Sequence, residues 1–182
     1  PRQKPSAVRR RRVMALSKLS GDEAGIVFDG LRNVLEPHTA VYLSSASNEL
    51  RAATETLLQQ LRADHEAAAA LGRKMGMRSC KELREASQIN WGDKGLTATD
   101  LATLGTLGSL LPALELLGLD ESSLNSAGHD GVQRLAEGLS AGALPHVFLL
   151  TLANMHVGDA GASALAAALG RGALPRIEII FL

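Results

Sequence analysis

Two segments near the C-terminus of the 182-residue chain are near copies of each other, and this duplication limits the folds that the chain can adopt. The first copy begins at Gly128 and the second at Gly158, 30 residues later. Each copy continues to a Gly-Ala-Leu-Pro segment, which ends at Pro145 or Pro175. A fixed period of about 20 to 50 residues indicates stacked units that bury an apolar core only together. We therefore expect an extended surface of the kind that such stacks use for binding.

Each copy combines one helix with one strand. Before the proline, Leu135 and Leu139, or Leu165 and Leu169, have the i,i+4 spacing of one helix face. A third, degenerate copy has its proline at residue 112. Apolar residues stand two, five and seven positions after each proline: Leu114, Leu117 and Leu119; Val147, Leu150 and Leu152; Ile177, Ile180 and Leu182. The last two of each set are two residues apart, so we predict that both point to the buried side of a strand.

The stretch LTLANMHVGDAGA, from Leu150 to Ala162, resembles the strand, turn and helix start of leucine-rich repeats of the ribonuclease-inhibitor type. Gly92-Asp-Lys-Gly95 resembles the same turn, so the resemblance covers about residues 92–182. It implies an α/β fold, a short right-handed solenoid of about three parallel strands with outer helices. The family usually has Asn or Cys three residues after the second strand leucine. Here Met155 and Ser122 hold that position, and Asn154 stands one residue early.

The chain divides by pattern into three parts. Residues 1–12 are rich in Arg, Lys, Pro and Ser and are expected to be a disordered basic arm. Residues 13–90 are expected to form a helical cap, and residues 91–182 the repeats. The segment 88–95 is expected to be a turn-rich junction, in which Trp91 packs as a plug and does not stack on a ligand.

The helices of the cap have clear boundary signals. Asp22 and Glu23 favour a helix N-terminus, and Pro37 ends that helical segment. A long helix is predicted to begin at Ser47 or Asn48 and to reach about Met75. Residues 79–87 follow as a short helix. We expect the long helix to pack within the domain, because Asp64 interrupts the apolar stripe that a coiled coil would need.

Residues 19–51 of this cap resemble an F-box, a small set of helices that often precedes leucine-rich repeats. The resemblance rests on Leu19-Ser-Gly-Asp-Glu23 and the apolar spacing after it, although the usual Leu-Pro start is Leu-Ser here. It implies that four apolar residues face the adaptor subunit of a cullin-type ubiquitin ligase: Leu19, Ile26, Phe28 and Leu31. The alternative is a plain helical cap that buries these residues against the repeats.

Charge is unevenly distributed along a chain whose formal net charge is zero. Six of the 19 basic residues lie in the first twelve positions, including the run Arg9, Arg10, Arg11 and Arg12. The remaining 13 basic residues and the 19 acidic residues give the rest of the chain a net charge of −6. The arm is interpreted as a solvated tail, a nuclear-localisation run, a remnant of organelle targeting or a contact for an acidic surface. Aromatic residues make up only 3%, which argues against stacking on nucleic-acid bases.

The strand residues between the buried leucines are the predicted partner-binding site. In the repeat geometry they face the concave surface, and several of them are apolar. The residues with side chains that we expect to contact a partner are Leu116, Leu149, Thr151, Ile179 and Phe181, together with Arg9 to Arg12 of the arm. Gly118, Asp120 and Ala153 share this face. The last strand has no cap in the sequence, so we expect a partner or a missing segment to cover its edge.

No pattern for catalysis, a cofactor or a metal stands out. None of the five histidines has HExxH spacing; His146 and His156 flank a strand with no nearby carboxylate except Asp159, and are expected at the surface. The Gly128/Gly131 and Gly158/Gly161 pairs lack the Lys-Ser/Thr of a phosphate-binding loop.

The single cysteine, Cys80, excludes an intrachain disulfide and a multi-cysteine zinc site. A reducing, intracellular compartment fits this composition, in the cytoplasm or nucleus or in an organelle. No apolar run reaches the roughly 18 residues of a membrane span.

The sequence therefore predicts a non-enzymatic scaffold or interaction protein that binds other protein subunits, with no cofactor. The alternative is a substrate-recognition subunit of a ubiquitin ligase. A regulator that covers and inhibits an enzyme would share the same architecture.

Overall fold

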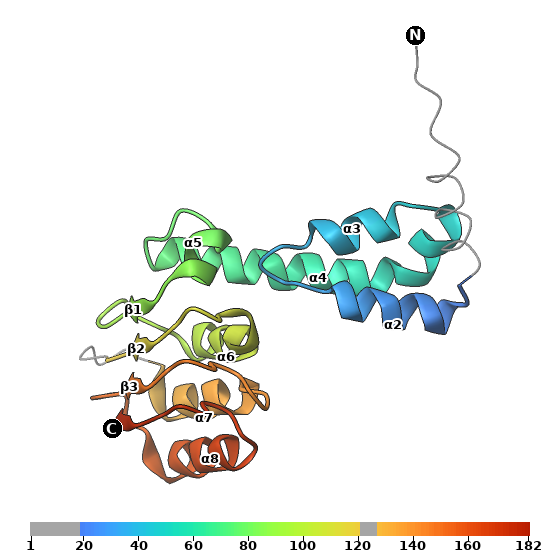
Figure 1. Ribbon diagram of the computed structural model, residues 1–182. Helices are drawn as coiled ribbons and strands as arrows, with labels where there is room; N and C mark the ends of the chain where they lie inside the picture. The colour runs from blue at the N-terminus through green and yellow to red at the C-terminus, as the bar shows by residue number, and fades with distance from the viewer. Residues whose placement is uncertain (1–18, 121–126) are drawn as a thin grey trace. The chain divides into compact units, whose positions relative to one another are not determined.

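The computed structural model describes residues 19–120 and 127–182, apart from the side chains at 128 and 129. These residues form a mixed α/β structure with seven α-helices and four parallel strands (Figure 1). The chain divides into two compact units, residues 1–65 and 66–182, and the division falls inside the long helix α4, Asn48–Lys74. The sequence pattern placed the change from helical cap to repeats near residue 90. Each unit is described separately below.

Unit 1 is helical in its described part. Helix α2, Gly21–Leu31, begins with a capping box in which Ser20 accepts from the Glu23 backbone N–H and the Glu23 side chain accepts from Ser20. Helix α3, His38–Ser44, begins directly after Pro37, where the sequence predicts a break. The first part of α4 completes the unit. Its core consists of Ala24, Phe28, Ala40, Leu43, Leu50 and Leu61.

Two pairs of polar side chains join different elements of unit 1. Ser44 and Thr54, both buried, share a hydrogen bond of 2.8 Å, and the Thr54 hydroxyl also donates to the Leu50 carbonyl. Arg32 forms a salt bridge with Asp64. The acidic residue that interrupts the apolar stripe of α4 therefore has a partner within its own unit, which agrees with intradomain packing of this helix.

Unit 2 contains a sheet of four parallel strands in the order β1-β2-β3-β4. The strands are β1 Gln88–Asn90, β2 Leu116–Gly118, β3 Leu149–Thr151 and β4 Ile179–Phe181. The sequence predicted about three strands and a turn-rich junction at 88–95. That prediction was wrong at β1, because residues 88–90 pair with β2 and bury Ile89. Trp91 follows β1 and is buried, as expected of a packing residue.

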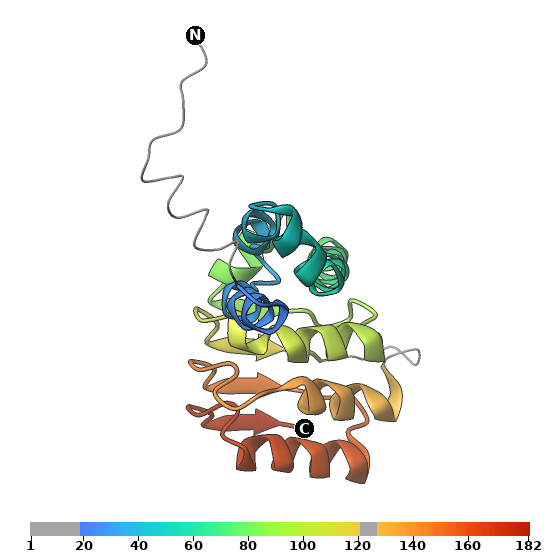
Figure 2. The ribbon, with the colours of Figure 1, turned by 90° about the vertical axis from the view of Figure 1, so that its right-hand side faces the viewer.

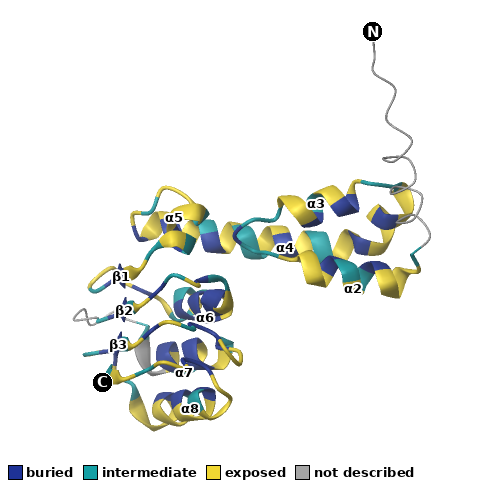
Figure 3. Ribbon diagram, in the orientation of Figure 1, coloured by how far each residue is buried: buried dark blue, intermediate teal, exposed yellow. Residues whose placement is uncertain are grey.

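The helices of unit 2 are the end of α4, then α5 Cys80–Glu85, α6 Ala98–Leu107, α7 Gly128–Gly138 and α8 Gly158–Gly170, with a short 3-10 helix at Gly108–Leu110. Helices α6, α7 and α8 stack in chain order on one side of the sheet (Figures 1 and 2). Burial is concentrated between these helices and the strands (Figure 3). No helix of unit 2, within its described residues, lies on the other face of the sheet (Figure 1).

The 30-residue duplication has the same backbone conformation in both copies. Gly142 and Gly172 have φ angles of 73° and 87°, and Leu144 and Leu174 have φ angles of 53° and 51°. The N–H of Leu144 donates to the Gly108 carbonyl, and the N–H of Leu174 donates to the Ala143 carbonyl, each at 2.9 Å. Hydrogen bonds between neighbouring loops therefore hold two leucines in the left-handed region, which non-glycine residues rarely occupy.

The turns after β1 and β3 also correspond. Asp93 and Asn154, each three residues past the strand end, have φ angles of 54° and 63°, and Gly95 and His156, two residues later, have 65° and 49°. Asp and Asn tolerate the left-handed region better than most residues. Asn154 therefore stands one residue early because the turn needs that conformation there. Met155, at the usual Asn position, is buried.

The predicted burial of the strand leucines is confirmed in the two inner copies. Six of these side chains are at most 1% exposed: Leu114, Leu117, Leu119, Val147, Leu150 and Leu152. The prediction was wrong for Leu182, which is 66% exposed. It follows β4, which pairs on one side only within the described sheet, so fewer neighbours cover it.

The hydrogen bonds at the start of α6 should make the stability of the fold depend on pH. Asp100 completes a capping box with Thr97, and Lys74 Nζ donates to the Asp100 carboxylate at 2.5 Å and to the Gly95 carbonyl at 2.7 Å. Burial opposes ionisation, but the hydrogen bonds from Lys74 and Thr97 outweigh it and lower the pKa of Asp100. The carboxylate therefore stabilises the fold above its unfolded pKa, and this contribution is lost as the pH falls through the folded pKa.

We expect Asp100→Asn to lower the free energy of unfolding by about 1 kcal/mol at pH 7, because the amide loses the charge that strengthens the hydrogen bonds from Lys74 and Thr97. The difference from the wild-type protein should shrink as the pH is lowered to 3, because the unfolded wild-type chain then binds a proton at Asp100 that the folded chain binds less readily. Urea unfolding at both pH values measures this. A difference that is equal at pH 7 and pH 3 would contradict the role of the charge.

Candidate binding surface on the parallel sheet

The register of the sheet arranges its uncovered side in two rows. Gln88, Leu116, Leu149 and Ile179 are neighbours across the four strands in the first row. Asn90, Gly118, Thr151 and Phe181 are neighbours in the second row. The residues between the rows point into the core, because side chains alternate along a strand. We call these eight residues the exposed face.

The exposed face becomes more apolar from β1 to β4. Gln88 and Asn90 are exposed and polar, Leu116 and Leu149 are half-buried, and Ile179 and Phe181 are 42% and 54% exposed. All five strand residues that the sequence singled out for partner binding are therefore brought together on this face. Among the described residues, its apolar end is the most exposed hydrophobic part of the sheet.

Three residues without large apolar side chains were also assigned to this side of the sheet, and all three are buried or half-buried: Gly118, Asp120 and Ala153. Gly118 is buried, because Asn90 and Thr151 lie close on either side: a Cβ here would meet Thr151 Oγ1 at 3.3 Å and Asn90 Oδ1 at 3.5 Å. Asp120 is half-buried, and its Oδ1 accepts from the Ala153 N–H at 3.1 Å. This carboxylate joins the turns of neighbouring copies, a structural role that the strand pattern did not predict.

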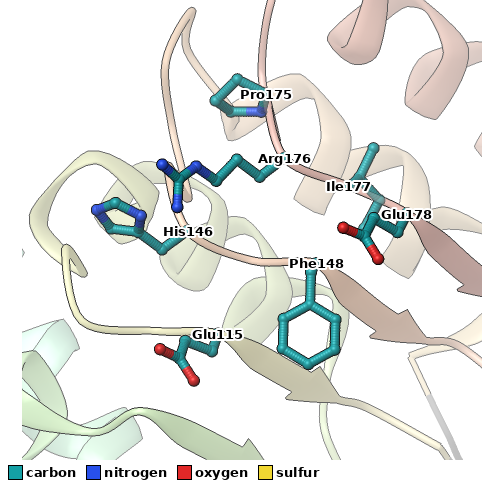
Figure 4. Close-up of a pocket in the computed structure, with 7 residues that line it drawn as sticks. All are labelled: Glu115, His146, Phe148, Pro175, Arg176, Ile177 and Glu178. Atoms are coloured by element: carbon teal, nitrogen blue, oxygen red, sulfur yellow. The ribbon is translucent and has the colours of Figure 1, made fainter.

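A pocket of about 650 Å³ lies along the segments that lead into β2, β3 and β4. We call it the pre-strand pocket. Its lining includes two carboxylates, a histidine, an arginine and an aromatic ring, all labelled in Figure 4: Glu115, His146, Phe148, Pro175, Arg176, Ile177 and Glu178. The position three residues after each proline contributes Glu115, Phe148 and Glu178 in turn.

The sequence reasoning missed this pocket. It described His146 as a residue with no nearby carboxylate except Asp159, whereas the structure places His146 in one pocket with Glu115 and Glu178. The error arose because carboxylates 31 and 32 residues away in sequence are brought near by the parallel pairing of strands. The constant offset from proline was the signal that could have located them.

Unit 1 also exposes apolar side chains. Ile26 and Tyr42 are each 73% exposed and Leu31 is 36% exposed, whereas Phe28 is fully buried in the helical core. The prediction that Phe28 faces an adaptor is therefore wrong, because its ring fills the interior of unit 1. Leu19 packs partly against that core. Arg9 to Arg12 lie outside the described residues.

Reactive and metal-binding groups are sparse in the described part. Burial raises the pKa of the Cys80 thiol, and the positive charge of Arg73 only partly opposes this, so the thiolate is disfavoured. No group of three or more His, Cys, Asp or Glu side chains within residues 19–120 and 127–182 gathers as a metal site. No helix in the same ranges is long and apolar enough to cross a bilayer.

The chain was compared with known families, proteins and structures. No protein-family model matches the chain, and no match is found among curated proteins or among solved structures.

Proposed function

We propose that this chain is a non-enzymatic interaction module, built from leucine-rich repeats, that binds another protein through the exposed face. The observation that carries the proposal is the apolar end of that face, where Leu149, Ile179 and Phe181 lie together and no described helix of unit 2 covers them. Apolar groups that remain grouped at a surface usually mark a site of association.

The repeated backbone supports the architectural part of the proposal. Helices α7 and α8 begin 30 residues apart, strands β3 and β4 are offset by the same number, and the loops between them share their left-handed leucines. In a stack of helix–strand units, equivalent strand positions of successive copies line up in a row across the sheet. Such a surface suits the binding of an extended or convex partner. The basic arm would add a second contact on an acidic surface.

The test is affinity purification of the tagged chain in wild-type form and as Phe181→Asp. We expect the captured partner to fall by more than tenfold in the variant, because a charge replaces an apolar contact. Ala162→Asp is the matched control, since Ala162 is exposed on α8, on the helical side of the sheet. Capture that Phe181→Asp leaves unchanged, or that both variants reduce equally, would contradict binding through this face.

A second candidate function is the F-box-like role, and the exposed Ile26 on α2 favours it. In that case the same purification recovers cullin and adaptor subunits, and Ile26→Asp removes them while Phe181→Asp does not. Stable recovery of one complex without those subunits favours the scaffold role.

A further inference from the structure

The pre-strand pocket is formed by the three segments that lead into β2, β3 and β4, and backbone hydrogen bonds join each segment to the next. The Phe148 N–H donates to the Glu115 carbonyl at 3.0 Å, and the Glu178 N–H donates to the Phe148 carbonyl at 2.9 Å. Neighbouring parallel strands are about 4.8 Å apart, so Glu115 and Glu178 stand about 10 Å apart with Phe148 on the segment between them. Figure 4 shows the three side chains on consecutive segments.

The groups on these segments are available to a ligand. Both glutamates are exposed, and neither forms a salt bridge with a described residue. Arg176 lies in the same pocket, but its guanidinium is not paired with either carboxylate there. The Phe148 side chain is 38% exposed, which is unusual for a phenylalanine beside a sheet. The pocket thus presents an aromatic ring with two negative charges and one positive charge around it, and the negative charge is in excess.

This combination favours one ligand chemistry. A cation is attracted to the face of an aromatic ring, and carboxylates on either side add charge-assisted hydrogen bonds. An anionic ligand would have Arg176 and His146 as partners but would face repulsion from two glutamates. An apolar ligand would leave both carboxylates partly desolvated without a partner.

We propose that the pre-strand pocket takes a lysine or arginine side chain of the partner, from an extended segment whose apolar residues lie on the exposed face. The pocket lies at the N-terminal ends of the strands, because Glu115, Phe148 and Glu178 directly precede Leu116, Leu149 and Ile179 of the first row. A partner segment that passes over these strand ends would contact both the pocket and the first row. The inference rests on the proposed function and adds the charge of the ligand to it.

The experiment selects random twelve-residue peptides, displayed on phage, against the immobilised chain. Selected peptides are synthesised, and their affinities are measured by fluorescence anisotropy for four proteins: wild type, Glu178→Gln, the control Glu137→Gln on α7, and Leu149→Asp. Glutamine keeps the size of the side chain and removes its charge. Circular dichroism verifies that each variant is folded.

We expect the selected peptides to be enriched in Lys or Arg beside apolar residues. Glu178→Gln should weaken their binding about tenfold, the usual effect of losing one charge-assisted hydrogen bond, and Glu137→Gln should have no effect. The loss should shrink at high salt, because screening weakens exposed charge pairs. Leu149→Asp should remove binding altogether.

Two kinds of failure are distinguishable. The pocket proposal is overturned if the selected peptides lack basic residues, carry acidic ones, or bind Glu178→Gln as tightly as wild type. The proposal that partners bind the exposed face still stands in that case if Leu149→Asp abolishes binding. Peptides that bind Leu149→Asp as well as wild type overturn the exposed face itself. A selection that enriches no peptide counts against both.

Discussion

Replacing Leu150 by aspartate is expected to unfold unit 2, whereas the same replacement at the adjacent Leu149 leaves it folded. Leu150 is 1% exposed at the centre of β3, between β2 and β4. A carboxylate there loses its hydration and gains no partner, which costs several kcal/mol, comparable to the whole stability of a typical domain. Far-ultraviolet circular dichroism and urea titration of both variants measure the difference.

Leu149→Asp serves as the control for that result, because its side chain points to the uncovered side of the same strand. Since Leu149 is half-buried, its replacement should lower the free energy of unfolding by about 1 kcal/mol, a typical value for a point mutation and far less than for Leu150→Asp. The variant should keep the helix signal and lose partner binding. If both substitutions unfold the protein equally, the Leu149 side chain is part of the folded core and is not available to a partner. The binding proposal would then lose its basis.

Alanine at Gly105 is expected to lower the free energy of unfolding by about 2 to 3 kcal/mol, the usual cost of overpacking a close contact. Its Cβ would lie 2.4 Å from the Leu135 carbonyl oxygen and 3.1 Å from the Gly138 Cα. Both obstacles are backbone atoms of α7, so relief requires α6 and α7 to separate. The shift of the urea midpoint measures the cost.

Gly170→Ala is the matched control in the same stack. Gly170 is the last residue of α8, and a Cβ there would have open space around it. Since alanine favours a helix more than glycine does, this variant should be neutral or stabilised by up to about 1 kcal/mol. Equal destabilisation by Gly105→Ala and Gly170→Ala would exclude close helix contact as the cause.

Much of the local structure could be predicted from the chain alone. Pro37 separates two helices, α4 runs from Asn48 to Lys74 as its start signal and apolar stripe predict, and Ser79 caps a short helix. The burial of Leu117 in β2 and of Leu150 in β3 also followed from spacing. These features depend on neighbours within a few residues, where the physics is local.

The candidate site was only half predictable. The exposed strand residues followed from period two, but β1 was missed because Gln88 to Asn90 carry a single apolar residue between two polar ones. The sheet completes this strand by pairing it with β2, a tertiary effect that overrides weak local preference. The pre-strand pocket was missed for the same reason, since its charges lie on three separate copies.

The sequence by itself determined the repeat, the helices and the side of each inner strand that is buried, because periodicity encodes which face an element hides. Only the tertiary structure decided which residues become neighbours across copies: Glu115 and Glu178 on either side of Phe148, Gly105 against Gly138, and the Asp120 carboxylate on the Ala153 N–H. Successive residues in each of these sets are 30 to 33 positions apart in the sequence. Their register is set by how the strands and helices pack, which no local pattern specifies.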